Sequence, residues 1–233
     1  MPIPFRPIAR LLTRTLHPAP KVDLSAVQTY LHKMEHEGQR QGVLITVNHY
    51  SAPDFQAWWF AILISAVVPA DIHWVVTSGW TNSGWLTGFT RWVFPRGARL
   101  LGFTPMPAMP PDPADTEKRA MAVRQVLRYA RLTSNPVIGM APEGGDHPGG
   151  VLGRLPAGVG RFMHLLSQSC QNVIPVGVWT AEGRINLKFG SPFQLEIPPG
   201  LSTHECDTLV GEIVLHHIAE LLPEELRGAW QYS

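Results

Sequence analysis

Charged residues are scarce in this sequence: Asp, Glu, Lys and Arg together make up 16% of its 233 residues. Typical soluble domains carry roughly 25%. Acidic and basic residues nearly balance, which leaves a formal net charge of +1. Because proteins that bind nucleic acid usually show a basic excess, the overall charge indicates no nucleic-acid partner, and we expect none.

Cysteine is nearly absent as well. The two cysteines, Cys170 and Cys206, lie far apart and match no metal-binding or redox spacing. We therefore expect a reducing compartment, two buried thiols, and neither a metal nor a resident cofactor.

Long apolar runs are also missing. The longest uncharged stretch, 55–70, is shorter than the roughly 20 residues that span a bilayer, and it includes Gln56 and Ser65. We predict a buried helix there. The N-terminus lacks the apolar core and small residues of a signal peptide. The expected location is cytoplasmic, with any membrane contact peripheral and on the inner face.

Strand-like and helix-like segments alternate along the chain, which is typical of an α/β fold with a mostly parallel central sheet flanked by helices. At this length we expect a single domain over 1–233. The predicted strands cover 43–47, 72–76, 137–141, 173–178 and 184–189. One predicted helix begins at Asp23 and ends before Gly38. The other predicted helices cover 55–70, 115–133, 157–170 and 201–222.

The N-terminal segment 1–22 is basic, since no acidic residue precedes Asp23. Helical spacing over 4–16 predicts an amphipathic helix with apolar and basic positions on different sides. The apolar positions are Ile8, Leu11, Leu12 and Leu16, and the basic ones are Arg6, Arg10 and Arg14. Such a helix either lies among lipid headgroups or packs on the domain with its basic side in water.

Aromatic and arginine residues interleave without any acid over 78–103. The aromatic residues are Trp80, Trp85, Phe89, Trp92 and Phe94, and the arginines are Arg91, Arg96 and Arg99. A core helix with a basic edge, a membrane-interface segment and a single-stranded nucleic-acid surface all fit this pattern. The balanced overall charge favours the membrane over nucleic acid.

A His and an Asp occupy the turn Asn48-His49-Tyr50-Ser51-Ala52-Pro53-Asp54, between a predicted strand and a predicted helix. A carboxylate that accepts from one imidazole nitrogen leaves the other free to take a proton. His49 and Asp54 are therefore candidate catalytic residues. In the alternative interpretation, Ser51 caps the helix and the Asp54 carboxylate accepts hydrogen bonds from its first N–H groups.

A second loop, 142–150, follows the predicted strand 137–141 and contains Glu143, Gly144, Gly145 and Asp146. Ligands collect at the carboxyl ends of strands in open α/β sheets, so both loops can face one pocket. Glycines let a substrate approach the backbone. The loop lacks the ending of a nucleotide P-loop, and a glycine-rich turn is often only a turn.

Taken together, these motifs resemble the glycerolipid acyltransferase family, of the lysophosphatidic acid acyltransferase type, over 40–190. Asn48-His49 with Asp54 matches the first family motif, Ala141-Pro142-Glu143-Gly144 the start of the third, and Val173-Ile174-Pro175-Val176 the fourth. The second family motif is matched only at its beginning, by Leu101-Gly102-Phe103. The resemblance implies that His49 and Asp54 are catalytic and that Asn48, Glu143, Gly144 and Gly145 lie in the substrate site. Glu143 either positions substrate or braces its loop.

Two positions of the third motif depart from the family pattern, and Pro156 and Ala157 stand where the family often has basic residues before the helix Gly. Where the family has Thr-Arg, with an Arg understood to bind the acceptor's phosphate, this chain has Gly145-Asp146. Arg154 and Arg161 are candidates to replace that cation, the latter in the first turn of a helix whose N-terminus favours anions. We therefore expect an acceptor other than lysophosphatidic acid.

The expected reaction transfers a fatty acyl group from acyl-CoA or acyl-carrier protein to a hydroxyl or amine of a lipid or small molecule. Two alternatives remain open at this stage. One is a hydrolase that gives the acyl group of the thioester to water with the same His and Asp. The other is an inactive homologue that binds lipid or a membrane.

Overall fold

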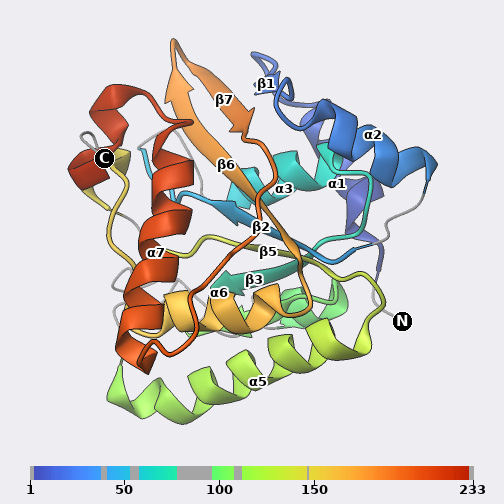
Figure 1. Ribbon diagram of the computed structural model, residues 1–233. Helices are drawn as coiled ribbons and strands as arrows, with labels where there is room; N and C mark the ends of the chain where they lie inside the picture. The colour runs from blue at the N-terminus through green and yellow to red at the C-terminus, as the bar shows by residue number, and fades with distance from the viewer. Residues whose placement is uncertain are drawn as a thin grey trace.

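The strands of this chain form one sheet in the order β1-β7-β6-β2-β5-β3-β4 (Figure 1). The computed structural model describes residues 3–37, 41–52, 58–77, 96–107, 112–145 and 147–230. Neighbouring strands are parallel except for the β6–β7 pair, which is antiparallel. The expected α/β fold with a mostly parallel sheet is confirmed.

The strands are β1 (Lys21–Asp23), β2 (Val43–Val47), β3 (His73–Thr77), β4 (Thr104–Met106), β5 (Val137–Met140), β6 (Asn172–Ala181) and β7 (Arg184–Phe189). The helices are α1 (Phe5–Thr13), α2 (Gln28–His36), α3 (Trp58–Val67), α5 (Thr116–Leu132), α6 (Val159–Ser167) and α7 (Thr203–Ala219). Short 3-10 turns lie at Pro113–Asp115, Pro148–Gly150, Glu224–Leu226 and Gly228–Trp230.

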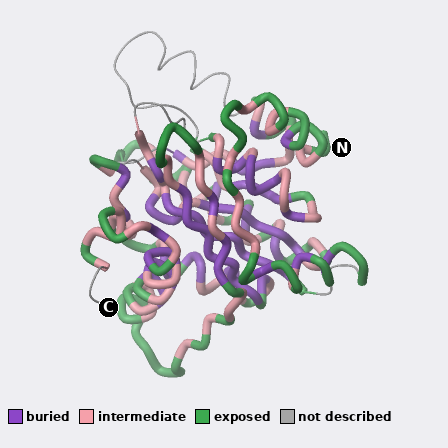
Figure 2. The backbone as a smooth tube through the Cα atoms, turned by 90° about the horizontal axis from the view of Figure 1, so that it is seen from above, coloured by how far each residue is buried: buried purple, intermediate pink, exposed green. Residues whose placement is uncertain are grey.

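Helices cover both faces of the sheet, so its central strands are buried on both sides. All five residues of β2 are buried. Val43, Ile45 and Val47 belong to the apolar cluster that α2 and α3 complete. Leu44 belongs to the cluster completed by α5, α6 and α7. Figure 2 shows the buried backbone gathered in the interior and the exposed backbone around it. Burial on both faces explains why the central strands are continuous apolar runs.

The differences from prediction lie at the edges of the sheet and at the ends of helices. The short edge strands β1 and β4 were not predicted. Asp23 does not begin a helix, because its Oδ1 accepts from the N–H of Ser25 at 3.0 Å and holds a turn. Helix α2 begins only at Gln28. Cys170 is buried as expected, whereas Cys206 is partly exposed.

Two predicted segments fall partly outside the described residues. They are the start of the apolar helix at 53–57 and most of the aromatic and arginine-rich stretch, 78–95. Within the described part of the chain, no helix combines the length and the apolar character needed to cross a bilayer.

The parallel register brings the carboxyl ends of the central strands to one edge. Thr46 of β2 pairs with Met140 of β5 and with Pro175 of β6. The segments that follow these positions, the turn at His49 and the loop at Glu143, therefore leave the sheet side by side.

Candidate active site

His49 and Glu143 are brought together by the strand register itself. Val43 pairs with Val137, an offset of 94 residues that the parallel ladder keeps through Thr46 and Met140. The same offset separates His49 from Glu143. The N–H of His49 donates to Oε2 of Glu143 at 2.6 Å. The two motifs that sequence analysis placed at strand ends are thus joined by a direct hydrogen bond.

The Glu143 carboxylate ties three segments together. Its Oε1 accepts from the N–H of Gly153 at 2.7 Å, while Oε2 accepts from His49. The residue is only 3% exposed. Burial raises the pKa of the Glu143 carboxyl, and the two N–H donors partly oppose that rise. Both oxygens are used by the backbone, so the described geometry gives Glu143 a bracing role for the His49 turn.

Asn48 is fully buried and is used in the same way. Its Nδ2 donates to the carbonyl of Val178 at 2.9 Å, and its Oδ1 accepts from the N–H of Val178 at 2.7 Å. This paired contact fastens the end of β2 to the middle of β6. The side chain fixes where His49 leaves the sheet, because its two polar ends are both committed to β6.

Tyr50 anchors the other side of the turn. Its hydroxyl lies 2.8 Å from Oγ1 of Thr180 on β6, and its ring is buried. Gly150 packs against this ring so closely that a Cβ there would lie 2.6 Å from a ring carbon. Gly150 also has a φ of +70°, which favours glycine. The loop 142–150 is therefore seated on the His49 turn.

His49 itself is partly buried. Its ring forms a T-shaped pair with that of Phe60 on α3, with centroids 6.1 Å apart and an interplanar angle of 70°. A partly buried imidazole on a braced turn is suited to proton transfer, since the backbone that carries it is held in place while the ring stays partly accessible.

A second histidine lies beside the buried carboxylate. Nε2 of His147 is 3.7 Å from Oε1 of Glu143. The His147 ring lies over Gly153, where an added Cβ would overlap it. Gly144 turns the chain with a φ of +72°, and both Gly144 and Gly145 are partly buried. The sequence motif did not single out His147, although its i, i+4 spacing from Glu143 is visible in the sequence.

Several backbone N–H groups near His49 already have acceptors. Those of Tyr50, Gly144 and Gly150 donate to the carbonyls of Asn48, Ala141 and His147, at 3.0, 3.2 and 3.1 Å. The N–H of Gly153 is taken by Glu143. A developing oxyanion therefore needs donors other than these four groups.

The N-terminus of α6 is occupied by a carboxylate of the chain itself. Oδ2 of Asp207, on α7, accepts from the N–H of Gly158 at 2.7 Å, and Oδ1 accepts from the N–H of Arg161 at 2.8 Å. The side chains of Arg154 and Arg161 are exposed. This helix end is thus already capped by the Asp207 carboxylate. No local sequence pattern indicates this contact, because Asp207 lies 46 residues beyond Arg161.

The remaining two candidates, Asp54 and Asp146, lie outside the described residues. Their roles stay predictions from the sequence. Among the described residues, no group of three or more His, Cys, Asp and Glu side chains is arranged to hold a metal ion.

Comparisons with known proteins bear on the fold. No protein-family model matches the sequence. A search of curated proteins gives no match either. Among solved structures, the chain is similar to the crystal structure of the 1-acyl-sn-glycerophosphate (LPA) acyltransferase PlsC from Thermotoga maritima. The TM-score is 0.51 at 16% sequence identity, over 93% of this chain and 78% of that one. This likeness shows that the chain shares the overall fold of that acyltransferase, in line with the fold that the motifs led us to expect.

Proposed function

We propose that this protein is an acyltransferase that moves a fatty acyl group from a thioester donor to a hydroxyl or amine of a lipid or small-molecule acceptor. The observation that carries the proposal is the hydrogen bond from the His49 N–H to the buried Glu143. It unites two motifs 94 residues apart at the carboxyl edge of a sheet, on a fold shared with an LPA acyltransferase.

In the proposed mechanism, His49 is the general base. Its imidazole takes the proton of the acceptor hydroxyl or amine as that atom attacks the thioester carbonyl. The tetrahedral intermediate then collapses, the carbon–sulfur bond breaks, and the thiolate leaves with the proton that His49 returns. Asp54 orients the imidazole and stabilises its protonated form, as the acid does in a triad.

Glu143 and Asn48 act as positioning residues in this scheme. Each holds the His49 turn through paired hydrogen bonds to backbone groups of another segment. The donor is acyl-CoA or acyl-carrier protein, and no resident cofactor is needed, because the attacking nucleophile belongs to the acceptor.

The proposed acceptor carries no phosphate beside its reacting group. Asp146 stands where the family has its phosphate-binding Arg. The alternative anion site at the start of α6 is filled by Asp207. Because a phosphate dianion needs cations or free N–H donors, a neutral or cationic acceptor fits these residues better.

Thiol release from acyl-CoAs tests the proposal. The purified protein is assayed with and without a panel of phosphorylated and unphosphorylated acceptors, and His49→Ala is the key variant. We expect release that requires an unphosphorylated acceptor and falls at least 100-fold in His49→Ala, since a lost general base costs about 10²–10⁴.

Arg184→Ala, an exposed change on β7, is the control and should keep full activity. Release without any acceptor would instead make the protein a thioester hydrolase. Near-normal activity in folded His49→Ala would rule out the mechanism. No release from any acyl-CoA or acyl-carrier protein would leave a fold that only binds.

A further inference from the structure

The outer face of α5 combines arginines with exposed apolar side chains. At 100° per residue, Arg124, Arg128 and Arg131 share one side of the helix, opposite the buried Ala122, Val126 and Ala130. Met121 and Leu132 flank them and are 57% and 73% exposed. We call Met121, Arg124, Arg128, Arg131 and Leu132 the α5 arginine face.

The charge of this region has one sign. From Lys118 to Pro142 the chain contains Lys118, Arg119, Arg124, Arg128 and Arg131 but no acid. The acid of the same helix, Glu117, lies in its first turn. Within the described part of the chain, no ion pair is recorded for Arg124, Arg128 or Arg131. These three guanidinium groups are thus available to an outside partner.

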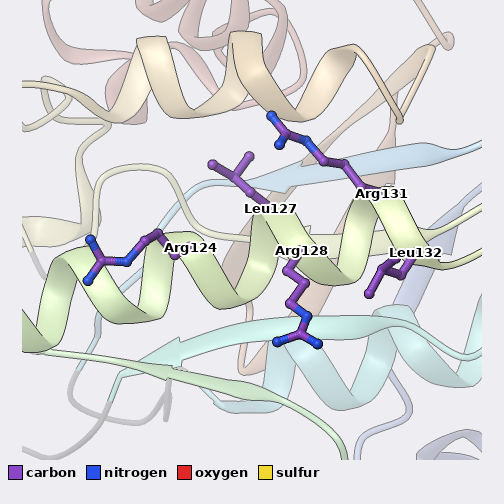
Figure 3. A pocket seen from close by; sticks show the side chains of 5 residues that line it. All are labelled: Arg124, Leu127, Arg128, Arg131 and Leu132. Carbon is purple, nitrogen blue, oxygen red and sulfur yellow. The ribbon is translucent and has the colours of Figure 1, made fainter.

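The shape of the face favours an extended partner over a single phosphate. Arg124, Leu127, Arg128, Arg131 and Leu132 line a shallow hollow of about 380 Å³. Figure 3 shows the three guanidinium groups pointing in different directions along the helix. Seven residues separate Arg124 from Arg131, about 10 Å along the axis. Groups spread in this way match several carboxylates on a surface and do not converge on one anion.

The position of the face favours a soluble partner over a membrane. Helix α1 carries the basic N-terminal segment and packs with α3 on one side of the sheet, whereas α5 packs on the other side (Figure 1). A flat bilayer that α1 touches cannot also reach the α5 arginine face. With a bilayer on the α1 side, the α5 arginine face would point toward the aqueous side, from which a water-soluble donor arrives.

We infer that the α5 arginine face docks an acidic acyl-carrier protein that delivers the thioester, an inference that rests on the proposed acyl transfer. Acyl-carrier proteins are small acidic helical proteins, so charge complementarity steers the encounter. Helix α5 begins at the edge where His49 lies, because it follows β4, which is parallel to β3. Arg124 is about 12 Å along the axis from that start, which leaves the flexible phosphopantetheine arm free to reach the site.

Binding of unacylated holo-acyl-carrier protein, measured by titration calorimetry, tests the face without any turnover. Arg128→Glu reverses one charge of the face and keeps a good helix former. Arg184→Glu, exposed on β7, is the matched control. We expect at least a tenfold weaker affinity in Arg128→Glu, a further loss in Arg124→Glu/Arg128→Glu, and no change in Arg184→Glu.

Kinetics with two donors bearing the same acyl group provide the second measurement. Arg128→Glu should raise KM at least tenfold for the acyl-carrier protein and leave kcat/KM for acyl-CoA unchanged. An equal effect on both donors, an equal loss in Arg184→Glu, or no carrier binding by the unaltered protein would overturn the inference.

Binding to anionic phospholipid vesicles tests the remaining possibility, that the α5 arginine face binds a membrane. If Arg128→Glu abolishes vesicle binding and leaves carrier binding intact, the face belongs to a membrane and the inference is wrong. Turnover of acyl-CoA without carrier binding would refute the docking surface and leave the proposed function standing. Carrier binding without turnover of any donor would support the docking surface and refute the proposed function.

Discussion

At the scale of single residues, the site depends on buried polar side chains whose partners are backbone groups. Asn48 and Glu143 each use both of their polar ends to hold another segment in place. An unsatisfied buried donor costs about 1–3 kcal/mol, so these contacts fix the loops more firmly than apolar packing alone. The proposed base, His49, lies between them and is positioned by both.

Glu143→Gln tests this positioning. The amide has one accepting oxygen, so either His49 or Gly153 loses its acceptor and faces an NH₂ group instead. We expect kcat to fall about tenfold, which corresponds to about 1.4 kcal/mol, with little change in KM for the donor. The melting temperature should move little, because removing a buried charge offsets the lost hydrogen bond.

Exposed Glu196 provides the control, and Glu196→Gln should leave kcat unchanged. An unchanged kcat in Glu143→Gln would show that the brace does not matter to catalysis. A rise in KM for the acceptor, with kcat constant, would assign Glu143 to substrate binding instead.

The residues of the site could be predicted from the sequence more readily than their partners. Asn48, His49 and Glu143 stand at strand ends next to apolar runs, so local pattern and the geometry of parallel sheets place them at one edge. Val178 and Asp207 contribute through long-range packing that leaves no local signal. The occupied start of α6 was missed for this reason, since only the fold brings α7 against it.

At the scale of elements, length and burial decide which segments the sequence reveals. Strands β2 and β5 are buried throughout and β6 over its first seven residues, so the apolar pattern predicts them. Strands β1 and β4 have three residues each and lie at the two edges of the sheet. Each pairs with a single neighbouring strand and has no apolar run of its own, so the sequence pattern does not reveal it.

His73, the first residue of β3, links that strand to β4 and α5. Its Nε2 lies 2.9 Å from Oγ1 of Thr104, and its ring stacks on Tyr129 at 4.0 Å. Burial lowers the pKa of His73 to about 4, although a hydrogen bond with the backbone of Gly102 opposes that shift. The folded protein thus keeps His73 neutral where the unfolded chain, with a pKa of 6.5, takes up a proton.

This difference predicts how stability depends on pH. The contribution of His73 is complete above pH 6.5 and is lost as the pH falls toward 4, by up to about 3 kcal/mol. His73→Gln keeps a polar side chain that does not titrate. Urea unfolding between pH 7 and 4 should show the variant losing less stability than the unaltered protein. Parallel curves for the two proteins would contradict the burial of a neutral imidazole.

Gly139 of β5 allows a large side chain to cross its strand. It pairs with Trp74 of β3, and a Cβ on Gly139 would lie 2.6 Å from the indole ring. The indole is held by a 2.8 Å hydrogen bond to Ser65 on α3 and is only 1% exposed. Room for the ring therefore exists only because residue 139 has no side chain.

Gly139→Ala should lower the free energy of unfolding by about 1–3 kcal/mol through overpacking, as measured by chemical denaturation. Gly97→Ala is the matched control, because nothing lies within 4 Å of a Cβ there. It should leave stability unchanged or raise it slightly, through reduced entropy of the unfolded chain. Equal effects of the two substitutions would argue against the close Trp74 contact.

At the scale of the whole molecule, the two faces of the sheet carry different exposed surfaces. Helix α1 buries Ala9 and leaves Leu11 63% exposed, and Nε of Arg10 donates to the carbonyl of Ala66 on α3 at 3.2 Å. The N–H of Ile3 donates to the carbonyl of Leu100 at 2.9 Å, and these side chains are 43% and 58% exposed. Exposed apolar side chains beside basic ones suit a lipid headgroup layer, which supports peripheral membrane contact through this side.

Leu11→Glu tests whether the α1 side meets a membrane. Each exposed apolar side chain that enters the headgroup layer contributes through its buried area, and a carboxylate there is also repelled by anionic lipid. We expect Leu11→Glu to reduce binding to anionic vesicles at least fivefold in a flotation assay. Leu132→Glu changes a leucine on α5 that is also largely exposed, and it should leave vesicle binding unchanged and weaken binding of the acidic carrier protein. If the two variants exchanged these effects, the membrane and carrier surfaces would have to be exchanged as well. Because the same two substitutions are measured against both partners, a general loss of folding would reduce all four affinities and be recognised at once.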